Sequence, residues 1–175
     1  YKMKILKYFI QAFFLYIFFI IIFLFRIKIS RLIFSNFFRI FGPLFRSDNI
    51  IKKNLLFIDS SIKKEEFSSI KKKMWSNYGK NFVEYLFLKK FRSSNNYVNI
   101  KNENYLTDVI NKKKQVIFVS GHFANFELMS MELTKAGIDL ATIYRPLNNF
   151  FLNPFMEYLR KNYVCKNQIK KGITG

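Results

Sequence analysis

The sequence predicts an α/β protein in which a transmembrane or membrane-anchoring helix and a helical region precede a parallel sheet. Two observations lead to this prediction: a long apolar run stands near the N-terminus, and the last part of the chain alternates between strand and helix patterns. Such alternation favours a parallel sheet with right-handed crossovers. We expect a membrane anchor over residues 1–30, interfacial and amphipathic helices over 31–92, and the first part of an α/β domain over 93–175.

The anchor is predicted from the run Tyr8 to Phe25, which contains no charged residue. A helix of about 20 apolar residues covers the hydrocarbon core of a bilayer. A secretory signal peptide is the alternative, since three lysines precede the run, but Arg26 and Lys28 follow it where a cleavage site needs small residues. Because basic residues are more numerous after the run, the positive-inside rule places the rest of the protein in the cytoplasm.

Two further helices are predicted before the sheet. From Arg31 to Gly42, apolar residues recur at spacings of three and four. This pattern suits a helix lying in the membrane interface, and equally a helix that faces a protein core. The second helix runs from about Lys63 to Leu88, with an apolar stripe opposite a lysine-rich face. The polar stretch from Arg92 to Asn104 is expected to be a connection with one short strand.

The elements of the α/β part follow from short apolar runs and helical periodicity. They are a buried strand in "QVIFVS" (115–120), a helix over 125–136 closed by Gly137, a strand in "DLATIY" (139–144) and a helix over 150–162.

The charge of the chain is strongly positive, with 30 Lys and Arg against 11 Asp and Glu, which gives +19. Such a charge suits an anionic membrane, an acidic partner or nucleic acid. The basic residues are scattered and are not grouped with stacking aromatics, which argues against nucleic acid. One cysteine and one histidine allow neither an internal disulfide nor a Cys/His zinc cluster. We expect no metal and no cofactor.

The one histidine, His122, follows the first predicted strand, and Glu127 comes five residues later. Reactive groups gather beyond the carboxyl ends of strands in open α/β sheets. A turn between the two residues would let the carboxylate of Glu127 hold one imidazole nitrogen and leave the other as a base. Such a pair can move an acyl group from a thioester to a hydroxyl without a serine or cysteine nucleophile. A structural histidine held by backbone groups is the alternative.

The segments "SGHFANFELM" and "ATIYRPLNNFFLNPFMEYLRKN" resemble the lipid A biosynthesis acyltransferase family, whose late acyltransferases add lauroyl or myristoyl chains to a lipopolysaccharide precursor. The family pattern is Gly-His-Phe-Gly-Asn-Trp-Glu, which contains His-x4-Asp/Glu, followed by Tyr-Arg-Pro and an asparagine. The resemblance implies that His122 and Glu127 are the catalytic pair and that the fold is an α/β sheet open to the membrane. It covers nearly the whole chain, including the N-terminal anchor and Glu84.

The substrate-binding residues implied by this resemblance are Arg145, Asn125 and one of Asn148 and Asn149. Arg145 is expected to bind a phosphate or polar head group, because a guanidinium grips such oxygens in bidentate fashion. A loop arginine in a salt bridge is the alternative.

Two residues depart from the family pattern: Ala124 replaces a glycine and Phe126 replaces a tryptophan. Ala124 would be strained if its position needed a positive φ. The later segments of the family pattern do not follow, so we expect the chain to correspond to the first half of a member. We expect the fragment to be inactive without its C-terminal half.

The resemblance implies an acyltransferase that moves a fatty acyl group from acyl carrier protein to a hydroxyl of a lipid A precursor. The enzyme would work on the cytoplasmic side of the inner membrane, and the acidic carrier protein would suit its basic charge. Its partners would be the carrier protein, the lipid acceptor and the membrane. One alternative is an acyltransferase for another lipid, such as a lysophospholipid, aminolipid or glycolipid. Another is a non-enzymatic, membrane-anchored protein that binds through its basic face.

Overall fold

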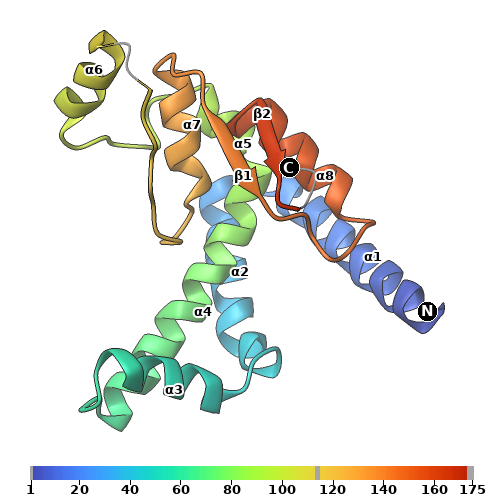
Figure 1. Ribbon diagram of the computed structural model, residues 1–175. Coiled ribbons are helices and arrows are strands. Elements are labelled where there is room, and N and C mark those ends of the chain that lie inside the picture. The colour runs from blue at the N-terminus through green and yellow to red at the C-terminus, as the bar shows by residue number, and fades with distance from the viewer. Residues whose placement is uncertain (1, 113–114, 173–175) are drawn as a thin grey trace. The chain divides into compact units, whose positions relative to one another are not determined.

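The computed structural model describes residues 2–112 and 115–172, and in this part the chain is mostly helical with a two-stranded parallel sheet (Figure 1). The chain divides into two compact units. Residues 19–86 form the helical unit, and residues 1–18 with 87–175 form the mixed unit. The elements are α1 (Lys2–Leu24), α2 (Ile27–Phe41), η1 (Gly42–Leu44), α3 (Asp48–Ile58), α4 (Lys64–Leu86), α5 (Leu88–Arg92), α6 (Glu103–Lys112), α7 (Glu127–Lys135), β1 (Ala141–Tyr144), α8 (Asn153–Leu159), η2 (Arg160–Val164) and β2 (Asn167–Lys170).

The long apolar helix predicted near the N-terminus is present as α1. It is long and apolar enough to cross a membrane, and 11% of its most apolar window is buried in the protein. Its first residues belong to the mixed unit and its last residues to the helical unit.

The helical unit is built on the packing of α2 against α4 (Figure 1). Phe34 of α2 is buried, and a Cβ added to Gly79 of α4 would lie 2.2 Å from the carbonyl oxygen of Phe34. The helix backbones therefore approach closely because position 79 has no side chain. Ser35 and Ser76 share a hydrogen bond of 2.6 Å across the same contact. Arg31 and the buried carboxylate of Glu84 form an ion pair at 3.2 Å.

The helix predicted from residue 31 begins earlier in the structure, at Ile27, and ends before Gly42 and Pro43 as expected. It faces the core of its unit through Phe34, in agreement with the second of the two interpretations. Its other side exposes Ile29, Ile33 and Ile40, which lie on one stripe because they are four and seven residues apart. The interfacial interpretation therefore stays a prediction for that side.

In the mixed unit, β1 and β2 are parallel, with Ala141 opposite Asn167 and Tyr144 opposite Lys170. The connection between them contains α8 and η2, and η2 packs against α5, α7 and β2. The turn η2 is π-helical, as shown by the hydrogen bond from Cys165 N to Arg160 O at 2.9 Å. The helix α7 ends at Lys135, and Gly137 closes it as predicted, because this glycine adopts a φ of 88° and Ile138 N bonds back to Leu133 O.

The strand predicted in 115–120 is wrong for this structure. The segment is irregular, and Ile117 and Val119 are 89% and 91% exposed. A strand exists only where a neighbouring strand pairs with its backbone, and in the described part of the chain β1 pairs with β2 alone. The short strand expected within 92–104 is also wrong, because α5, irregular chain and the start of α6 occupy that stretch. The α/β prediction is therefore confirmed only as a small parallel sheet among helices.

Candidate active site

A turn between residues 121 and 126 positions the start of α7. Phe123 N bonds to Gly121 O at 2.9 Å, and Ala124 adopts a φ of 46°. The position that carries glycine in the family pattern thus does require a left-handed backbone, which costs an alanine roughly 1–2 kcal/mol. The turn delivers His122 and Glu127 to one cavity of about 1220 Å³ in the mixed unit. We call this space the large cavity.

Glu127 is fixed at the wall of the large cavity by an ion pair. Its side chain is 8% exposed, and its Oε1 accepts a hydrogen bond from Arg160 Nε at 2.7 Å. Arg160 is the first residue of η2 and is 14% exposed, so the pair is largely withdrawn from water. A carboxylate held by a guanidinium in this way keeps one orientation.

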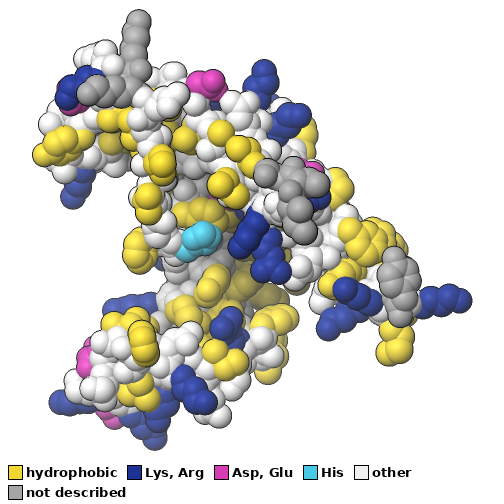
Figure 2. All heavy atoms as spheres, in the orientation of Figure 1, with side chains coloured by type: hydrophobic (Ala, Val, Ile, Leu, Met, Phe, Trp, Pro, Cys, Tyr) yellow, Lys and Arg dark blue, Asp and Glu magenta, His cyan; other side chains and the backbone are white. Residues whose placement is uncertain are grey.

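His122 is exposed and stacks on a neighbouring ring. Its imidazole centroid lies 4.1 Å from that of Phe126, at an interplanar angle of 38°. Figure 2 shows the histidine at the surface of the protein (cyan). Among the described residues no hydrogen bond joins His122 to Glu127, so the direct pair stays a prediction. Phe126 stands where the family pattern has tryptophan, and it supplies the flat apolar surface for the imidazole.

Arg145 follows β1 and lines the large cavity together with His122 and Glu127. It is exposed, and the described residues give it no ion pair. Lys171 lines the same cavity beyond the end of β2. Two cationic groups thus stand at the carboxyl ends of the two strands, which suits an anionic group on a bound molecule.

The three predicted asparagines do not line the large cavity. Asn125 is buried in the turn before α7, and Asn148 is exposed on the loop after β1. Asn149 is buried, and its Nδ2 donates to Tyr8 O at 2.8 Å while its Oδ1 accepts from Phe151 N at 3.1 Å. In this structure Asn149 ties the loop to α1, and a substrate-binding role for these residues stays a prediction.

Sequence reasoning missed Arg160 and the polar groups beside it. The Arg160 guanidinium lies 5.9 Å from the ring centre of Tyr144, whose hydroxyl donates to Glu157 Oε1 at 2.8 Å. This hydrogen bond raises the pKa of Tyr144 and lowers that of Glu157, to which Asn153 Nδ2 also donates at 2.7 Å. The predicted helix over 150–162 contains Glu157, Arg160 and Lys161, and nothing in the sequence distinguishes Arg160 from the other two charged residues.

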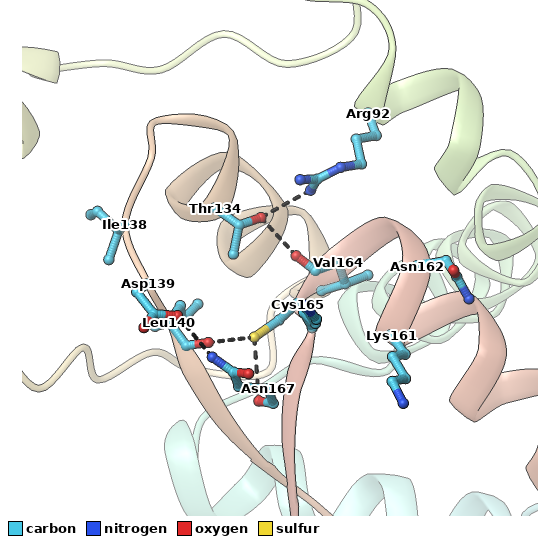
Figure 3. A pocket seen from close by; sticks show the side chains of 11 residues that line it. Arg92, Thr134, Ile138, Asp139, Leu140, Lys161, Asn162, Val164, Cys165 and Asn167 are labelled. Atoms are coloured by element: carbon cyan, nitrogen blue, oxygen red, sulfur yellow. Dashed lines mark hydrogen bonds between the residues drawn. The ribbon is translucent and has the colours of Figure 1, made fainter.

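A second cavity of the mixed unit, of about 590 Å³, is shown in Figure 3 and is called the small cavity. Arg92 of α5 donates to Thr134 Oγ1 at 2.9 Å and to Tyr163 O at 3.3 Å. Thr134 donates in turn to Val164 O at 2.8 Å, and Cys165 Sγ lies 2.8 Å from Leu140 O. The hydrogen bonds of Arg92 and Thr134 connect α5, α7 and η2. We therefore interpret the small cavity as a structural junction between these elements.

Within the described ranges 2–112 and 115–172, no group of three or more His, Cys, Asp and Glu side chains could hold a metal ion.

Comparisons with known proteins show the family that the sequence resembles. Residues 1–168 match the family profile of the bacterial lipid A biosynthesis acyltransferases. An uncharacterised protein of Acanthamoeba polyphaga mimivirus is 32% identical over 99 residues, which cover 51% of this chain and 34% of the relative. The chain thus spans about a third of the length of this curated relative. No solved structure gives a significant match.

Proposed function

Because the chain belongs to the bacterial lipid A biosynthesis acyltransferase family, we propose that it transfers a fatty acyl group from acyl carrier protein to a hydroxyl of a lipid A precursor. The reaction takes place at the cytoplasmic face of the inner membrane. The observation that supports this proposal is the large cavity, which is lined by His122, Glu127, Arg160 and Arg145. The apolar side chains of the same cavity, such as Phe118 and Met129, suit an acyl chain.

His122 acts as the general base of this reaction. It withdraws the proton of the acceptor hydroxyl while the oxygen attacks the thioester carbonyl. A tetrahedral intermediate forms, the carbon–sulfur bond breaks, and the thiolate takes the proton back from the imidazolium. The products are the ester and the free thiol of the carrier, so no covalent enzyme intermediate is needed.

Glu127 orients the imidazole and stabilises its positive charge during the transfer. For this the ring of His122 turns from Phe126 towards the carboxylate, a small rearrangement because both residues border the same turn. Arg160 is a positioning residue, since it holds Glu127 at 2.7 Å. Catalytic hydrogen bonds often form only when substrate is bound, so the stacking of His122 on Phe126 without a hydrogen bond to Glu127 among the described residues agrees with this role.

Arg145 and Lys171 bind anionic groups of the substrates. Phosphates of the lipid acceptor or of the carrier prosthetic group suit these cations, because charge-assisted hydrogen bonds to phosphate are strong. The net charge of +19 favours encounter with an acidic carrier protein and with anionic lipid. An acceptor of another lipid class would use the same chemistry.

The substitution His122→Ala tests this proposal. In the full reading frame that carries this chain, transfer from acyl carrier protein to the lipid acceptor should fall about 10²- to 10⁴-fold, which is the usual contribution of general base catalysis. Asn111→Ala is the matched control, because Asn111 is exposed on α6 and outside the large cavity. Near-normal transfer by a folded His122→Ala protein would exclude His122 as the base.

A further inference from the structure

The guanidinium of Arg160 has two candidate partners, one on a distant segment and one on its own helix. The distant partner is Glu127 of α7, whose Oε1 accepts from Arg160 Nε at 2.7 Å. The local candidate is Glu157 of α8, which precedes Arg160 by three residues and is therefore its neighbour on the helical surface. Among the described residues, no ion pair joins Arg160 to Glu157, so the structure selects the distant carboxylate.

The selected pair is the one that costs more to remove from water. The side chain of Glu127 is 8% exposed, whereas Glu157 is half-buried. A charge withdrawn from water loses its hydration, and this loss can exceed the attraction between the two charges of a pair. A pair with the more accessible Glu157 would avoid much of that loss. Some other feature of the structure must therefore disfavour the local pair.

The carboxylate of Glu157 is held by two other donors. The Tyr144 hydroxyl donates to its Oε1 at 2.8 Å, and Asn153 Nδ2 donates to the same oxygen at 2.7 Å. Asn153 is itself fixed, since its Oδ1 accepts from Leu147 N at 2.8 Å. These two bonds, chiefly the one from the tyrosine, lower the pKa of Glu157. The group is therefore an ionised carboxylate at neutral pH and would compete for Arg160 if it were released.

Tyr144 also contacts the guanidinium directly. The centre of its ring lies 5.9 Å from Arg160 Cζ, within the range of a cation–π contact. Tyr144 is the last residue of β1, and its backbone is fixed opposite Lys170 of the parallel strand β2. One residue on a fixed strand thus holds the competing carboxylate through its hydroxyl and supports the cation through its ring.

We propose that Tyr144 and Asn153 are positioning residues for Arg160. By holding the carboxylate of Glu157, they leave the guanidinium to its buried partner on α7. A hydrogen bond to a charged group changes an equilibrium between two partners by roughly 10- to 100-fold, so two such bonds suffice to select the partner. The inference rests on the proposed function in one respect, which is that the pair with α7 must be formed for acyl transfer.

The substitution Tyr144→Phe tests this selection, because it removes the hydroxyl and keeps the ring. In the full reading frame that carries this chain, we expect Glu157 to compete for Arg160, so that kcat falls about tenfold and Tm decreases. Adding Glu157→Gln removes the competing charge, and the double variant should recover most of both losses. Tyr158→Phe is the matched control, since the hydroxyl of Tyr158 lies 3.4 Å from that of Tyr163 and outside the large cavity. It should leave kcat unchanged.

Recovery by the second substitution separates positioning from a general structural role. If the hydroxyl mattered only for packing, the double variant would be as impaired as Tyr144→Phe, and this result would overturn the proposal. Asn153→Ser provides a second route if Tyr144→Phe folds poorly. It removes the other donor to Glu157 and keeps an oxygen that can accept from Leu147 N. Glu157→Gln should rescue this variant as well, and a failure to do so in a folded protein would contradict the proposal.

The measurement of Tm keeps this inference distinct from the proposed function, because unfolding requires no substrate. Rescue of Tm by Glu157→Gln in the Tyr144→Phe protein, together with normal acyl transfer by His122→Ala, would support the selection of partners and exclude the proposed function. Loss of transfer in His122→Ala without rescue of Tm or kcat by Glu157→Gln would support the proposed function and exclude the selection.

Discussion

The two cavities of the mixed unit each contain an arginine that contacts α7, and the two arginines have different partners. In the small cavity, Arg92 bonds a threonine hydroxyl and a main-chain carbonyl at the end of η2. In the large cavity, Arg160 bonds the buried carboxylate of Glu127. A cation at the end of a helix stabilises the junction by satisfying carbonyl groups. A cation on a buried carboxylate in the cavity that an exposed histidine also lines instead maintains a charged group at the proposed site of reaction. Similar residues therefore serve different purposes because their partners differ.

The largest expected loss of stability follows the removal of Arg160. Arg160→Ala would leave Glu127 buried without its cation, which typically destabilises a protein by about 3–5 kcal/mol. The double variant Glu127→Gln with Arg160→Met removes both charges and should recover most of that loss while remaining inactive. Chemical denaturation monitored by circular dichroism would measure both. If the double variant is as unstable as Arg160→Ala, the loss comes from packing and not from the uncompensated charge.

Arg92→Leu should have a smaller effect on stability and none on chemistry. The hydrogen bonds to Thr134 and Tyr163 are lost, at a cost of about 1–3 kcal/mol. Because the small cavity is a junction in our description, kcat and KM of the folded protein should stay at the wild-type values. A fall in kcat at full folding would show that the two cavities are not functionally separate.

Arg145→Ala should separate binding from catalysis within the large cavity. We expect the KM for the lipid acceptor to rise roughly tenfold, equivalent to about 1.4 kcal/mol, with a lesser change in kcat. Steady-state kinetics over a range of lipid concentrations would measure this. A fall in kcat at unchanged KM would instead place Arg145 in the chemical step.

The smallest expected effect concerns the turn that carries His122. Ala124→Gly should stabilise the protein by roughly 0.5–1 kcal/mol, because glycine adopts a positive φ without strain and loses part of this gain in the unfolded chain. Gly137→Ala is the matched control, since Gly137 also has a positive φ and open space around it. It should change the free energy of unfolding in the opposite direction. Equal signs for the two changes would contradict the strain at Ala124.

Four of the helices were predicted well from the sequence, whereas the helices α3 and α6 were not predicted. α1, α2, α4 and α7 each carry a long apolar pattern, and a helix forms its hydrogen bonds within its own segment. Strands depend on partners, and this explains the errors in the strand predictions. The apolar segment 115–120 has no pairing strand in the described part of the chain, whereas the polar segment of β2 forms a strand because β1 lies beside it.

In the candidate site, too, the features set by local sequence were predicted and those set by distant packing were not. The turn before α7 and the end of β1 bring His122, Glu127 and Arg145 to one cavity, although the strand that was predicted to end just before His122 is not formed. Arg160 lies 33 residues after Glu127 and reaches it only through the packing of η2 on α7, which no local pattern indicates. The amide of Asn149 can form hydrogen bonds with a ligand or with another part of the protein, and the sequence does not distinguish the two. Its hydrogen bond to Tyr8 O follows from the three-dimensional structure alone.

A substitution at Gly79 should make the fold of this protein heat-sensitive. An added methyl group would meet the backbone of α2 at 2.2 Å, so it could be accommodated only if two entire helices moved apart. The loss would then fall on the whole α2–α4 contact, and the free energy of unfolding would approach zero at a lower temperature than in the wild type. In a genetic selection, alanine at position 79 is therefore the substitution that we would expect among heat-sensitive alleles, although it is the smallest chemical change available there.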